Sequence, residues 1–324
     1  MSSPRRDVLR LVLWAAGIIL AALAVGLRTH DFGPAIRATV GPFGTLAAII
    51  LGSALADRLG AFGVLTRAIV PSRGHRVTSA AAVLALTALL SAVVNLDVAV
   101  MVAMPVSLRA AWRQHLPAGR LAIAVAMTAN AASFLLPTSN ITNLLLLRRL
   151  SLPALTYVSQ SWLPWLLVMT VTLAPLACWV GNASTGEAHP VTARPSLRAL
   201  TDLMPTFLIA SGVRTLLGAG LVLHGSFARQ LGEGTALASM ANNLPAAAAI
   251  VPDTRGAFWA AILATTIGPN LLITGSVATL ICRRIAREGG ARLSALRLSA
   301  IGLLLVPAQL AAATLGLHLA GALP

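Results

Sequence analysis

The 324-residue chain is 57% hydrophobic and only 10% charged, with a mean hydropathy of +0.84. This leaves too little polar surface to cover a soluble globular domain, so the composition excludes that class and indicates a multi-pass membrane protein. The formal net charge of +15 comes from 24 arginines and no lysine. Because these arginines gather in short loops between apolar segments, they indicate membrane topology and not nucleic-acid binding.

Cysteine and histidine usage points away from metal chemistry and from a disulfide framework. The two cysteines, Cys178 and Cys282, lie far apart, and the six histidines have no spacing typical of metal ligands. We therefore expect no metal site, no cofactor and no catalytic residues.

The first interrupted apolar segment predicts a hairpin. The segments 8–27 and 38–56 each have about the 20 residues needed to cross a bilayer. The next segment, 77–108, is interrupted by Asn95 and Asp97, and it is long for one span but short for two. We predict a re-entrant hairpin with its tip at these two residues and arms of about 15 residues each.

A second kind of interruption follows in the apolar segment 121–147. The sequence Pro137-Thr138-Ser139-Asn140 stands in its middle. Proline breaks helical hydrogen bonding, so this pattern predicts one discontinuous helix with an unwound centre. A span over about 160–181 completes the first half.

Beyond a polar linker at 182–202, the same order of features returns. It comprises a span at 203–223, a hairpin tip near 242–245, a broken segment at 256–282 with its break near 268–276, and a last span at about 298–320. We therefore predict an all-α inverted-repeat transporter with two re-entrant hairpins and two discontinuous helices, the first repeat covering 1–181 and the second 203–324.

The arginine distribution indicates the orientation of this layout. With a cytosolic N-terminus, Arg214 falls inside a span and 17 of the 24 arginines fall on the cytosolic side. The outer side receives six, namely Arg28, Arg37, Arg148, Arg149, Arg229 and Arg255. This bias agrees with the positive-inside rule and predicts two repeats of opposite orientation in the cell (inner) membrane.

Asp97 is the one acidic residue deep in an apolar segment. An ionisable group at that depth indicates a functional site, where it would bind H⁺ or Na⁺. The alternative is a structural charge pair with Arg214, because an unpaired charge at membrane depth is costly.

The remaining candidates are amide and hydroxyl side chains at the interruptions. Amides at a hairpin tip cap a helix or bind a solute, and equivalent amides in both halves favour binding. In the expected arrangement the two breaks face each other. The predicted substrate or ion site comprises Asn95, Asp97, Thr138, Ser139, Asn140, Asn143, Asn242, Asn243, Asn270, Thr274 and Ser276.

At these motifs the chain resembles the arsenite and antimonite efflux permeases, the arsenical pump membrane proteins of the ion transporter superfamily. The resemblance rests on Ala92–Pro105 with its Asn-Leu-Asp core, on Ala129–Asn143, on Ser239–Pro245 with Met-Ala-Asn-Asn-Leu-Pro, and on Gly268–Leu280. It implies a transporter that exports arsenite or antimonite as neutral hydroxides in exchange for protons, with Asp97 in the coupling role. It also implies a soluble ATPase subunit as a candidate partner, besides the bilayer, a small inorganic or anionic solute and a second copy of the chain.

Three features depart from that family. The chain is roughly a hundred residues shorter than the resemblance implies, the segment 226–241 is short and polar for an entering hairpin arm, and Asn130 stands where an acid is expected. The alternatives are a sodium- or proton-coupled carrier of another anion, of the dicarboxylate or citrate type, and a Na⁺/H⁺ antiporter. A shortened, non-transporting relative that binds a partner is a further class. An intramembrane aspartyl protease would need a second membrane aspartate.

Overall fold

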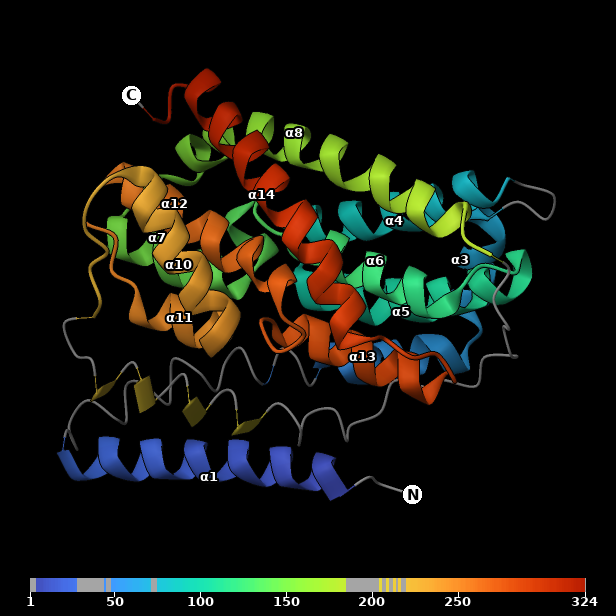
Figure 1. Cartoon of the computed structure of the whole chain (residues 1–324), viewed down its shortest axis with the longest axis horizontal. Helices are drawn as coiled ribbons and strands as arrows, with labels where there is room; N and C mark the ends of the chain where they lie inside the picture. The colour runs from blue at the N-terminus through green and yellow to red at the C-terminus, as the bar shows by residue number, and fades with distance from the viewer. Residues whose placement is uncertain are drawn as a thin grey trace.

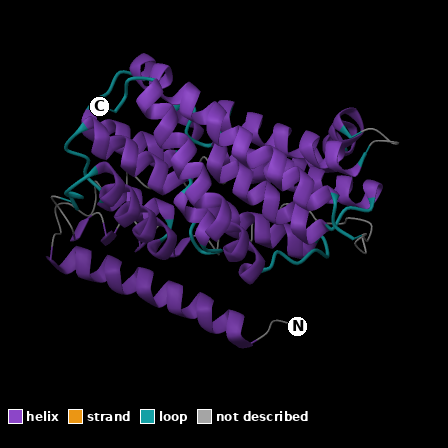
Figure 2. Ribbon diagram, turned by 45° about the horizontal axis from the view of Figure 1, so that its top comes forward, coloured by secondary structure: helices purple, strands orange, loops and turns teal. Residues whose placement is uncertain are grey.

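The fold is described from a computed structural model of the chain. It describes residues 4–27, 44, 48–70, 75–184, 204–205, 208–209, 212–213, 215–216 and 220–323. Every regular element in these ranges is a helix, and the only β contact within them is a single bridge between Leu221 and Ile250 (Figure 2). The predicted all-α class is confirmed.

Three described helices are long and apolar enough to cross a bilayer, namely α4 (Arg76–Val93), α8 (Ala154–Gly181) and α14 (Ala295–Leu319). A fourth span results if the helix Ala48–Arg58 and α3 (Ala61–Ile69), which are bent by 77° relative to each other, are taken together. In α1 (Pro4–Leu27), the apolar part runs from Trp14 to Leu27. These helices confirm a multi-pass membrane protein.

The first hairpin consists of α4 and α5 (Leu96–Gln114), which pack against each other and are joined by Val94 and Asn95. Its helices have 18 and 19 residues and are longer than predicted. The reason is that α5 continues as a helix through Arg109–Gln114, past the end of the apolar run. Asp57 forms an ion pair with Arg109 and so joins the bend before α3 to this arm.

The first broken segment follows as α6 (Ala118–Ala132), the 3₁₀ turn η1 (Pro137–Ser139) and α7 (Ile141–Leu150). The turn begins at the proline, which has no backbone N–H to donate to a continuing helix. Asn140 then starts α7 in extended geometry, with φ −150° and ψ 141°.

The second half repeats this order of elements. It contains α10 (Phe227–Ala241), α11 (Asn243–Ala249), α12 (Arg255–Thr266), η2 (Gly268–Leu271), α13 (Val277–Glu288) and α14. The segment judged too short for a hairpin arm is the 15-residue helix α10, which packs on α11. The other arm, α11, has only seven residues.

The predicted linker and the span at 203–223 lie largely outside the described residues. Where the described chain resumes, residues 220–223 are not helical, so the predicted span extends too far. Gly220 has a φ of 83°, and Leu221 exchanges backbone hydrogen bonds with Ala249 and Val251 at 2.7 and 2.9 Å. This pairing draws the chain away from helical geometry.

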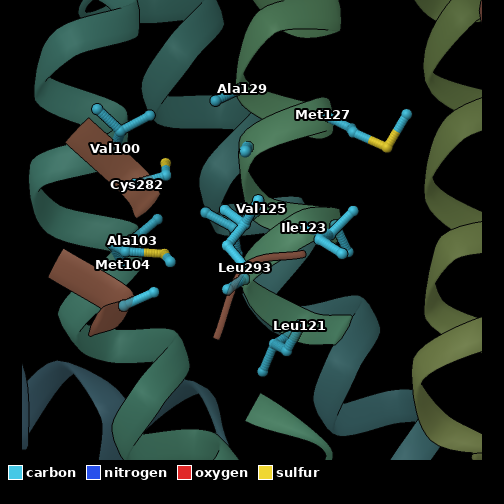
Figure 3. Packing of buried hydrophobic residues seen from close by; sticks show 14 of the residues in the cluster. Val100, Ala103, Met104, Leu121, Ile123, Val125, Met127, Ala129, Cys282 and Leu293 are labelled. Atoms are coloured by element: carbon cyan, nitrogen blue, oxygen red, sulfur yellow. The ribbon is translucent and has the colours of Figure 1, made fainter. Parts of the chain in front are cut away.

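The two halves are packed crosswise. Helix α5 of the first half contacts α13 of the second, and α11 of the second contacts α7 of the first. Figure 3 shows Val100 and Met104 of α5 beside Cys282 of α13 in the apolar core. Helices α8 and α14 cross one face of the bundle together, while α1 lies along the opposite side (Figure 1).

Candidate functional site

Four interruptions of the helices make up the candidate site. We call residues 94–97 and 242–244 the first and second tip, and residues 133–140 and 267–276 the first and second break. Each tip contains an asparagine, and each break ends in an N-cap residue, Asn140 or Ser276.

At the first tip, Asn95 uses both ends of its amide. Its Oδ1 accepts a hydrogen bond from the Asp97 backbone N–H at 2.8 Å and so caps α5. Its Nδ2 donates to the backbone carbonyl of Thr138 at 3.2 Å. Asn95 therefore fastens the first tip to the first break.

The second tip has the same pattern of side-chain hydrogen bonds. Oδ1 of Asn242 accepts from the Leu244 backbone N–H at 3.3 Å, and Nδ2 donates to the Thr274 carbonyl at 2.8 Å. Asn242 has a φ of 79° and a ψ of 148°, which lies outside the left-handed helical region and is a backbone conformation that residues other than glycine rarely adopt. Asn243 contributes through its backbone, donating to the Gly275 carbonyl at 2.8 Å.

A serine on the first helix of each hairpin adds a further hydrogen bond to the broken segment. Oγ of Ser91 donates to the carbonyl of Ala129 at 2.6 Å, and Oγ of Ser239 donates to the carbonyl of Gly268 at 2.8 Å. In the first half, the hydroxyl of Ser139 also donates to the Ala92 carbonyl. Each hairpin is thus held against the broken segment that follows it in the chain.

Inside the first break, amide side chains satisfy backbone groups that the unwound chain leaves free. Asn140 caps α7 through the Thr142 N–H at 3.1 Å and donates from Nδ2 to Ser133 Oγ at 3.2 Å. Asn143 donates from Nδ2 to the carbonyls of Ser133 and Leu136 at 2.8 and 3.3 Å. At the second break, Ser276 caps α13 through the Ala278 N–H at 3.1 Å.

Among the described residues, side-chain hydrogen bonds join the two breaks only indirectly, so their predicted facing stays a prediction. We expected Thr138, Ser139, Asn140 and Asn143 to face Asn270, Thr274 and Ser276, but no side-chain hydrogen bond joins these two sets among the described residues. Instead Asn270 bonds to α6, through Asn130 at 3.0 Å and the Met127 carbonyl at 3.0 Å. The reason is that η2 packs on α6.

Sequence reasoning missed several members of this network. Asn130 was noted only as a departure from a family pattern, and the roles of Ser91, Ser133, Ser239 and Thr279 were not predicted. The available signal was spacing, since Ser91 and Ser239 precede the tip asparagines by one helical turn.

Asp97 differs from all the amides in having no fixed partner. Its side chain is partly buried in the first turn of α5, and its carboxylate has no hydrogen bond or ion pair with any described residue. The corresponding position at the second tip is the apolar Leu244. Arg214 lies outside the described residues, so its pairing with Asp97 stays a prediction.

Several buried acceptors near the first break also have no partner in the described part of the chain. They are Oδ1 of Asn130, Oδ1 of Asn143 and Oγ1 of Thr142. The helix N-termini at Leu96, Ile141 and Val277 direct backbone N–H groups toward the tips and breaks, which favours negative charge. The described residues hold no group of His, Cys, Asp or Glu able to bind a metal ion.

Comparison with protein families gives a match. The family model described as a citrate transporter matches residues 6–280, which is most of the chain. A search of the curated proteins gives no match.

Proposed function

Because the chain belongs to the CitMHS citrate transporter family, we propose that it moves a small anion of the citrate type across the membrane as a secondary transporter. The observation that carries this proposal is the matched geometry of Asn95 and Asn242. Each asparagine caps the second arm of a hairpin and donates to a carbonyl in the adjacent break. Doubled interruptions of this kind are typical of transport sites at membrane depth.

The repeats are inverted in this proposal. The halves 1–181 and 203–324 carry the two hairpins into the membrane from opposite sides, as the arginine distribution indicates. The crossed contacts of α5 with α13 and of α11 with α7 support this arrangement, because each hairpin then meets the broken segment of the other half.

The chemistry of the breaks supports an anionic substrate. No arginine occurs in 133–143 or 268–276, so the positive potential there comes from backbone N–H groups at the starts of α7 and α13. Such helix N-termini, together with amide and hydroxyl donors, bind carboxylates without a charged side chain.

Asp97 supplies the coupling group. A carboxylate without a fixed partner is free to take up H⁺ or Na⁺ when the substrate is bound. The second half has no acid at the matching position, so coupling belongs to the first tip.

A second candidate is arsenite or antimonite efflux in exchange for protons. The observation that favours it is the same unpaired carboxylate, since Asp97 next to the site disfavours an anionic substrate but not a neutral hydroxide. The motifs Met-Ala-Asn-Asn-Leu-Pro at 240–245 and Gly-Pro-Asn at 268–270 also support this candidate.

Reconstituted vesicles test both candidates in one experiment. Uptake of labelled citrate, succinate and arsenite is measured with a pH gradient, with a Na⁺ gradient and with neither, against protein-free vesicles. Saturable citrate or succinate uptake supports the anion carrier, whereas arsenite uptake alone favours the second candidate. The proposal fails if none of the three solutes enters under any gradient.

A further inference from the structure

One residue, Asn130, connects the two breaks. Nδ2 of Asn130, near the end of α6, donates to Asn270 Oδ1 and to Thr279 Oγ1, both at 3.0 Å. Asn270 belongs to η2 and Thr279 to α13, so Asn130 bonds both to the second break and to the helix that follows it. All three side chains are buried.

The neighbours fix the orientation of the Asn130 amide. The Met127 carbonyl can only accept a hydrogen bond, so the Asn270 group at 3.0 Å from it must be the Nδ2 donor. The Asn270 Oδ1 acceptor then faces Asn130, which has to present its own Nδ2. Asn130 is therefore an obligatory donor at this position.

The backbone carbonyl of Asn130 is also hydrogen-bonded to the first break. Oγ of Ser133 donates to the Asn130 backbone carbonyl at 2.8 Å and accepts from Asn140 Nδ2 at 3.2 Å. A continuous chain of hydrogen bonds thus runs from the N-cap of α7, through Ser133 and Asn130, to Asn270 and Thr279.

Asn130 stabilises this region through its Nδ2 donor group and not through its Oδ1 acceptor. Its Oδ1 is buried and has no partner among the described residues, which is unfavourable. Only the two donor bonds offset that cost. An ionised aspartate at this position would have nearly the same size but could not donate either hydrogen bond.

We propose that Asn130 is a positioning residue that ties the two breaks into one unit, so that a rearrangement of either break is transmitted to the other. The consequence for transport rests on the proposed function above, but the hydrogen-bond linkage itself does not.

The test compares Asn130→Asp with Asn130→Ala. The control is Ser159→Ala, because Ser159 is exposed on α8 and its hydroxyl bonds to the Thr156 carbonyl of its own helix. At neutral pH both Asn130 variants are expected to lower the transport rate by about tenfold, because two hydrogen bonds are lost. In Asn130→Asp the rate relative to wild type recovers as the pH falls, since a protonated carboxyl group again donates one hydrogen bond. Asn130→Ala shows no such recovery, and Ser159→Ala transports like wild type.

All variants keep the ionisable side chains on the neighbouring helices, including Asp97, Tyr157 and Cys282. Dividing each variant's transport rate by the wild-type rate at the same pH therefore cancels the effect of their titration. The proposal is overturned if Asn130→Ala transports at the wild-type rate, or if both Asn130 variants have the same pH profile. If the wild type transports nothing, the proposed function fails. The linkage is then decided by the melting temperature of the purified proteins, where only Asn130→Asp should gain stability relative to wild type toward acid pH.

Discussion

Asp97 and Leu244 are the residues at which the two tips differ most. Both occupy the first turn after a capping asparagine, but only the first is ionisable. If the proposed coupling role of Asp97 is correct, the driving ion acts at the first tip.

Replacing Asp97 with Asn should separate coupling from binding. The amide has nearly the same shape but cannot ionise, so Asp97→Asn should abolish uptake driven by an ion gradient and retain exchange of labelled for unlabelled substrate. Vesicle uptake and counterflow measure the two activities. Glu233→Gln is the matched control, because Glu233 is an exposed acid paired with Arg229 at 2.7 Å. If Asp97→Asn keeps gradient-driven uptake, Asp97 is not the coupling group.

The tip asparagines give a second prediction at this scale. Asn95→Asp and Asn242→Asp keep the oxygen that caps the hairpin arm but lose the donor to Thr138 or Thr274. A lost cap costs about 1 kcal/mol, and losing a hydrogen bond to the carbonyl of Thr138 or Thr274, both exposed residues, costs about 0.5–1.5 kcal/mol. We expect the Asp variants to retain more stability than the Ala variants, while all four slow transport by about tenfold. Equal transport by the wild type and the Asp variants would show that the donor bonds are dispensable.

At the scale of elements, the sequence is informative where a helix has to stop. Pro137, Pro269 and the tip asparagines interrupt long apolar runs. The structure ends α4 and α10 beside the tip asparagines, whereas α6 and α12 end a few residues before the prolines, at Ala132 and Thr266. What could not be predicted is which groups meet across the breaks. Asn130 sits in an unremarkable helical run, Ala-Asn-Ala, and its partners lie 140 and 149 residues away, so only the tertiary packing of α6 on η2 and α13 brings them together.

Close contact between α14 and η2 depends on Gly302. A Cβ at this position would lie 2.3 Å from the Asn270 carbonyl oxygen, which is backbone and cannot move aside alone. Gly302→Ala should therefore push η2 away from α14, destabilise the fold by about 1–3 kcal/mol and weaken the bonds of Asn270. Thermal unfolding in detergent measures the loss. Gly256→Ala is the control, since its nearest neighbour is a Leu323 side-chain atom at 3.8 Å. Equal melting temperatures for the two variants would contradict the predicted role of this contact.

At the scale of the whole molecule, the inverted arrangement predicts that the bases of the two hairpins lie on opposite sides of the membrane. His75 precedes α4, His224 lies two residues before the N-cap of α10, and both are exposed. In a background with Cys178 and Cys282 replaced by alanine, His75→Cys should react with a membrane-impermeant maleimide only in everted vesicles. His224→Cys should react in intact cells, because the positive-inside rule places its loop outside.

The labelling pattern also distinguishes the inverted fold from its main competitor. If α10 and α11 entered the membrane from the same side as α4 and α5, both cysteines would react in the same preparation, and the crossed contacts between hairpins and breaks would need another topological explanation. Permeabilised cells, in which both positions should react, control for accessibility. Reaction from opposite sides would show that the two hairpins enter the membrane from opposite sides. The proposed single site between Asn95 and Asn242 requires this arrangement.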